Sequence, residues 1–64
     1  MTFRVTINYR DPSREPYEAT ADACEVESGF LSLHWYGEHG DILRSEMTPL
    51  DASEIESVQI VRIP

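Results

Sequence analysis

Apolar and polar residues alternate along most of this chain, most clearly in two stretches. In residues 2–10 every second residue is apolar or aromatic, and the same spacing recurs in residues 30–36, where Leu31, Leu33 and Trp35 alternate with Phe30, Ser32, His34 and Tyr36. Successive side chains of a β-strand point to opposite faces. The pattern therefore predicts two half-buried strands, each with one face toward a core.

Weaker alternation and turn residues predict the other elements. Further strands are expected at residues 15–20, 24–27, 42–47 and 56–63. Pro12 favours a type I turn over residues 11–14, and Gly29 supplies the positive φ of a hairpin turn. Residues 21–23 give no distinct pattern and are compatible with a bend, residues 37–41 are expected to form a loop, and residues 48–50 to end a strand. Asp51 as an N-cap, with Glu54 three residues later, predicts one helical turn at residues 51–55.

Six short strands joined by tight turns predict a single all-β domain over residues 1–64. The expected architecture is a small antiparallel meander, built as a strongly curled sheet or a small open barrel, with the helical turn before the last strand. The alternation also predicts which side chains are buried together: Phe3, Val5, Ile7, Leu31, Leu33, Trp35, Val58 and Ile60.

The net charge of −7 comes from twelve acidic residues against five arginines and no lysine. This balance disfavours direct binding of nucleic acid, which needs clustered basic residues, and attraction to anionic membranes. We see no signal peptide and no apolar run of transmembrane length, so we expect a cytoplasmic protein. Cys24 is the single cysteine and allows no internal disulfide. The use of arginine without lysine is typical of high-GC bacteria and their phages.

The residues that could bind a metal or take part in catalysis do not form a recognisable active site. His34, Glu38, His39 and Asp41 are of metal-ligand type, but their spacing matches no standard zinc site. We therefore expect no metal or other cofactor, and a melting temperature unchanged by zinc. Cys24 alternates with exposed glutamates and is expected in the core, where thiols are inert. The carboxylate pairs, such as Glu25 with Glu27, are expected to face water. We expect no enzymatic activity.

The features that favour binding lie on the opposite side of the expected strands. Phe30, His34 and Tyr36 form an outward stripe if Leu31, Leu33 and Trp35 are core, and such a stripe suits a protein interface. Alternatively, a curled sheet or the last strand covers it. Val61 and Ile63 share the second apolar face of the last strand.

The predicted function is a small interaction module that binds a protein partner or itself. The predicted interaction surface consists of Phe30, His34, Tyr36, Val61 and Ile63. The alternative is an acidic nucleic-acid mimic that inhibits a DNA- or RNA-binding enzyme, although an acidic balance more often only maintains solubility.

The chain also resembles a family. Residues 26–33 read V-x-x-G-x-L-x-L, and residues 49–60 read P-L-x-x-x-x-I-x-S-V-x-I. With the first strand and the Gly/Asp loop, this pattern resembles small uncharacterised acidic β proteins of actinobacteria and their phages. The resemblance implies a β fold and an actinobacterial or phage origin, and it implies no activity.

Overall fold

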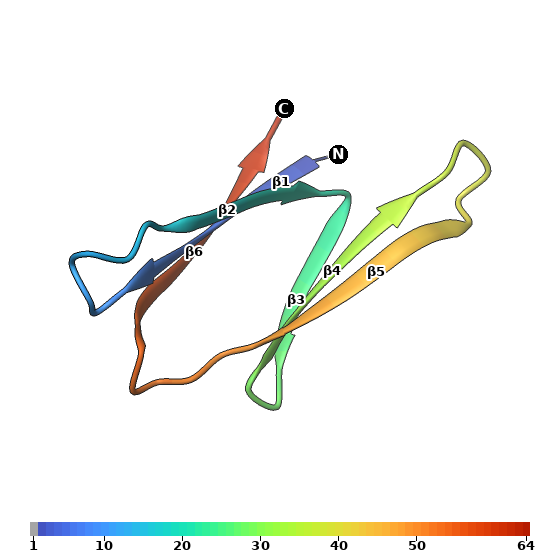
Figure 1. Cartoon of the computed structure of the whole chain (residues 1–64). Helices are drawn as coiled ribbons and strands as arrows, with labels where there is room; N and C mark the ends of the chain where they lie inside the picture. The colour runs from blue at the N-terminus through green and yellow to red at the C-terminus, as the bar shows by residue number, and fades with distance from the viewer. Residues whose placement is uncertain (1) are drawn as a thin grey trace.

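The computed structural model describes residues 2–64 and is all-β, with six antiparallel strands in two three-stranded sheets (Figure 1). One sheet has the strand order β2-β1-β6 and the other β3-β4-β5. No helix in residues 2–64 is long and apolar enough to cross a membrane. The strands are β1 (Thr2–Tyr9), β2 (Tyr17–Ala21), β3 (Ala23–Glu27), β4 (Phe30–Tyr36), β5 (Ile42–Pro49) and β6 (Ile55–Ile63).

The structure confirms the predicted all-β class and differs from the expected architecture in three ways. The chain forms two sheets and does not close into a barrel. β6 does not continue the meander but returns to pair with β1, on the side opposite β2. Residues 51–55 form a single hydrogen-bonded turn, in which the Glu54 and Ile55 amides both donate to the Asp51 carbonyl. It does not continue as a helix, because β6 begins directly at Ile55.

The structure has a tight hairpin between β3 and β4, as predicted at residues 27–29, with Glu27 itself part of β3. Glu27 pairs with Phe30, which leaves Ser28 and Gly29 as the central residues. Both have positive φ, at 52° and 78°. Two consecutive residues in this region make a type I′ turn, whose twist matches the twist of the flanking strands.

A corner at Asp22 joins the two sheets. β2 pairs with β1, and β3 continues after Asp22 to pair with β4. Three hydrogen bonds hold the corner: the Asp22 amide donates to the His34 carbonyl, the Asp22 carboxylate accepts from the Tyr36 amide, and the Trp35 indole donates to the Thr20 carbonyl at 2.9 Å. The predicted bend is therefore a single residue, and both flanking alanines belong to strands.

The core lies between β1 and β2 of one sheet and β3 and β4 of the other, which are the strands in contact across the two layers. Its fully buried members are Val5, Ile7, Ala21, Leu31 and Leu33. Four of these confirm the predicted core. Tyr17 and Ala19 pack against them, as predicted for the second strand.

The predicted core is wrong at Ile60 and incomplete at its margins. Ile60 is 42% exposed, because β6 is an edge strand and no strand of the second sheet covers it. Phe3, Trp35 and Val58 are half-buried. Ala21, expected in a bend, is buried instead.

Two polar turns, at residues 11–14 and 51–54, lie beside each other and have the same hydrogen-bond pattern. In each, an aspartate carboxylate accepts hydrogen bonds from the amide and the hydroxyl of the serine two residues later, at 2.9 and 2.7 Å. These bonds lower the pKa values of Asp11 and Asp51 below their ordinary value. The turns are joined by hydrogen bonds from the Arg10 amide to the Glu54 carbonyl and from the Arg10 guanidinium to the Ala52 carbonyl.

Stability is expected to fall in acid as these two carboxylates are protonated. Because their pKa values are lowered in the folded state, their contribution is fully present above the unfolded pKa, near 3.9, and is lost as the pH falls through the folded value. Between about pH 5 and pH 2.5, the free energy of unfolding measured in urea should therefore fall less steeply for Asp11→Asn/Asp51→Asn than for the parent.

The matched control is Glu18→Gln/Glu38→Gln, which removes two exposed carboxylates outside these turns. Equal slopes for the two double variants would show that overall charge, and not the turns, governs the acid response.

Candidate functional site

The outward side of the β3-β4-β5 sheet is the candidate site. In β4, Leu31 and Leu33 point to the core, so Phe30, His34 and Tyr36 occupy the opposite face. Phe30 and Tyr36 are 40% and 41% exposed, which agrees with the predicted outward stripe. The curled-sheet alternative, in which another part of residues 2–64 covers these rings, is not what the structure shows.

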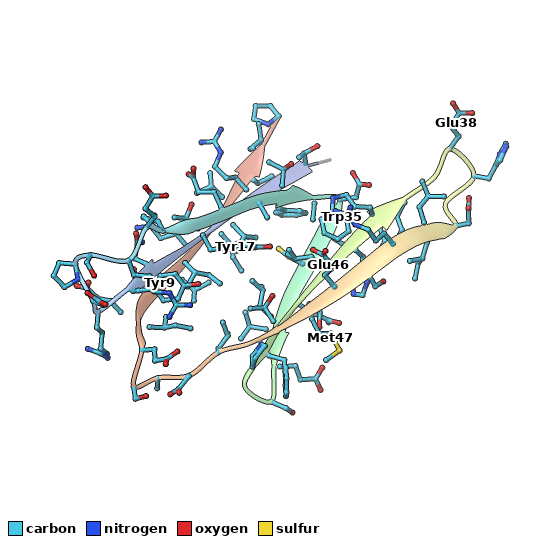
Figure 2. All side chains as sticks on the ribbon, in the orientation of Figure 1. Tyr9, Tyr17, Trp35, Glu38, Glu46 and Met47 are labelled. Atoms are coloured by element: carbon cyan, nitrogen blue, oxygen red, sulfur yellow. The ribbon has the colours of Figure 1, made fainter. Side chains whose placement is uncertain are left out.

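β5 adds apolar side chains to the same face. Its register sets Ile42 opposite Tyr36, Met47 opposite Ser32 and Pro49 opposite Phe30, and directly paired residues share a face. Ile42 is 61% exposed and Met47 66%. In Figure 2, Met47 and Glu46 leave β5 on opposite sides, as the alternation requires. We call Phe30, His34, Tyr36, Ile42 and Met47 the outer apolar face.

Sequence reasoning missed Ile42 and Met47 because the pairing register decides which side of β5 joins the stripe. Tyr36 pairs with Ile42 but Trp35 pairs with Arg44, so Leu43 is an extra residue in β5. Such a bulge reverses the alternation on one side of it. The 37–41 loop, in which Gly40 has a φ of 80°, precedes the first pair of this ladder. The alternation of residues within β5 does not indicate this pairing register.

The five predicted site residues fall on two different sheets. Phe30, His34 and Tyr36 lie together on β4. Val61 and Ile63 lie on β6, where they pair with Arg4 and Thr2 on the outward face of the β2-β1-β6 sheet. Val61 is 54% exposed and Ile63 half-buried. The structure therefore divides the predicted surface into two separate parts.

Acidic residues border the outer apolar face along β3. Glu25 pairs with Ser32 and Glu27 with Phe30, so both carboxylates lie on this face, and both are exposed as expected. Neither β3 nor β4 carries a lysine or arginine beside this border, and His34 is the one titratable base on these two strands. The surface therefore matches a partner with an apolar centre and basic residues around it.

His34 sits in the middle of the face and is held by polar neighbours. Its Nδ1 lies 2.8 Å from the Ser45 hydroxyl, a hydrogen-bonding distance, and its Nε2 lies 3.9 Å from a Glu25 carboxylate oxygen. The residue types are those of a Ser–His–acid triad. However, 3.9 Å is too long for the hydrogen bond that would orient the ring. Two hollows of the structure lie away from His34, one on the other sheet and one at the 11–14 and 51–54 turns.

The other residues that could bind a metal or act as a nucleophile do not lie close together. Within residues 2–64, no group of three His, Cys, Asp or Glu side chains is close enough to hold a metal ion. His34 lies in the sheet, whereas Glu38 and His39 are exposed in the projecting loop between β4 and β5 (Figure 2). Cys24 faces the core opposite Leu33 and is half-buried, and this burial raises the pKa of its thiol. A raised pKa reduces the thiolate fraction at neutral pH and hence its reactivity.

Comparison with known proteins gives no further guide to the function of this face. No protein-family model, curated protein or solved structure matches the chain.

Proposed function

We propose that this chain is a non-enzymatic interaction module that binds a protein partner through the outer apolar face. The observation that carries the proposal is that one face exposes four apolar side chains from two adjacent strands, Phe30 and Met47 toward one end of β4 and Tyr36 and Ile42 at the other. A single exposed apolar residue is ordinary, whereas exposed apolar surface collected on one face marks an interaction site.

The composition of the face also supports a protein partner. Aromatic residues and methionine are enriched at the centres of protein interfaces, and charged residues at their rims. The outer apolar face contains two aromatic rings and Met47, and Glu25 and Glu27 lie at its border on β3. Arginine without lysine and the sequence resemblance support an actinobacterial or phage origin as part of the same proposal.

Site-specific photo-crosslinking in an actinobacterial lysate tests this function. A photoreactive phenylalanine analogue replaces Tyr36, or in the control Thr20, which is exposed on the other sheet. We expect one defined protein to be crosslinked from position 36 and not from position 20. Met47→Ser should reduce that product, because it removes apolar contact without changing charge.

Salt distinguishes the proposed contact from the alternative function. A complex held by apolar burial should persist when salt rises to about 0.5 M, whereas a nucleic-acid mimic on a basic groove should dissociate steeply. A product that forms equally from both positions contradicts the proposed face. If the complex dissociates at high salt and its formation is unaffected by Met47→Ser, the result supports the acidic mimic instead.

A further inference from the structure

β6 is an edge strand whose outer side has no strand beside it. Its backbone ladder pairs with β1 alone, and the order β2-β1-β6 places it at the end of its sheet. It is also the longest strand, with nine residues. An unpaired edge exposes a row of backbone donors and acceptors that can bind another strand.

The edge strands β6 and β5, one from each sheet, differ in how they are protected against pairing with another strand. β5 carries a bulge at Leu43, ends in Pro49, and has Arg44 and Glu46 on its inner face. Bulges, prolines and inward-facing charges are the devices that protect edge strands from pairing. β6 has such features only near its ends, where Glu56 is an extra residue and Arg62 faces inward opposite Phe3. Its centre reads Ser57-Val58-Gln59-Ile60-Val61 and carries no charge, proline or bulge.

Both faces of β6 expose apolar side chains. Ile60 lies on the inner face and is 42% exposed, and Val61 on the outer face is 54% exposed. The molecule as a whole is also more open than its size predicts. Its accessible surface is 4700 Å², whereas a compact monomer of this mass exposes about 4,200 Å². Its radius of gyration is 12.6 Å, against about 11 Å expected for a compact chain of this length.

We propose that β6 pairs with β6 of a second copy, antiparallel and around a two-fold axis at Gln59, to form a six-stranded sheet. The strand is self-complementary in this register, because Gln59 is the central residue of Ile55–Ile63. Each residue then faces a residue of the second copy. The pairs are Glu56 with Arg62, Ser57 with Val61, Val58 with Ile60, and Ile55 with Ile63, each formed twice.

Charge and burial both favour this register. Each copy's Glu56 lies opposite Arg62 of the second copy, and cross-strand pairs of opposite charge stabilise a sheet. Each Ile60 lies beside Val58 of the second copy on the inner face, so the two cores become continuous. A shift by one residue would place inner faces against outer faces. A shift by two residues would place Arg62 opposite Val58, or Glu56 opposite Ile60.

The dimer contact is separate from the outer apolar face, so it does not rest on the proposed function. Two copies of charge −7 repel each other. Salt screens this long-range repulsion, and the dimer should therefore strengthen as the salt concentration rises.

Sedimentation equilibrium with a charge-swap set tests the proposal. In about 0.15 M salt we expect the parent chain to dimerise at micromolar concentration. Glu56→Arg and Arg62→Glu each create two like-charged pairs and should each weaken the dimer roughly tenfold. The double variant Glu56→Arg/Arg62→Glu restores both attractive pairs and the parent net charge, and should return the affinity to within about twofold.

Glu18→Arg is the matched control for net charge, since Glu18 is exposed on β2, at the far edge of the same sheet. It should not weaken the dimer. A parent that remains a monomer at about 200 µM overturns the proposal, as does a double variant that stays as weak as the single variants. Met47→Ser provides the distinction from the proposed function: it should leave the dimer unchanged and reduce only capture of the protein partner.

Discussion

Replacing Leu33 with alanine is expected to unfold most of the protein. Leu33 is fully buried between the two sheets, and truncation of a core leucine costs about 2–5 kcal/mol. A core of this size supplies no more than about 3–5 kcal/mol in total. The loss therefore removes most of the net stability.

Leu43→Ala is the matched control for this substitution. It makes the same chemical change at a side chain that is 68% exposed, and such changes usually alter stability by less than about 0.5 kcal/mol. Thermal and urea unfolding, followed by circular dichroism, compare the two variants. If Leu33→Ala melts like the parent, the assignment of β4 faces is wrong.

Replacing Trp35 with alanine is expected to have the second largest effect, because Trp35 links the two sheets. Its indole donates to the Thr20 carbonyl of β2 at 2.9 Å, and the Arg44 guanidinium of β5 stacks over the ring at 4.0 Å. The ring is half-buried, so the expected cost is about 3 kcal/mol, the lower end of the range for buried aromatic residues.

Trp35→Phe separates the ring from its hydrogen bond. Phenylalanine keeps an aromatic ring beneath Arg44 but cannot donate to Thr20, and the loss of one hydrogen bond costs about 0.5–1.5 kcal/mol. Urea unfolding followed by circular dichroism measures both variants. An equal loss for phenylalanine and alanine would assign the whole effect to the corner hydrogen bond, and no loss for either would contradict the role of Trp35 between the sheets.

Only part of the outer apolar face could be predicted from the alternation of residues in the sequence. The alternation of Phe30, His34 and Tyr36 with core residues was visible in the sequence, and the structure places all three on one face of β4. The contribution of Ile42 and Met47 was not visible, since it depends on the bulge at Leu43 and on pairing across a five-residue loop. The separation of Val61 and Ile63 from this face depends on β6 joining the other sheet.

The sequence by itself determined the all-β class, the course of β1 and β4, the Ser28–Gly29 hairpin and four of the five fully buried residues. These features follow from two local causes, the two-residue period of side chains along a strand and the φ preferences of turn residues. Both are contained in a few neighbouring residues and can therefore be read along the chain.

Only the tertiary structure decided how the strands are divided between sheets. The division arises at Asp22, where one residue turns the chain from β2 into β3, and in the return of β6 to β1 across more than forty residues. Such pairings depend on the balance of burial and chain entropy over the whole molecule. That balance leaves β6 at an edge, which is why Ile60 has the alternation of a core residue and yet is exposed.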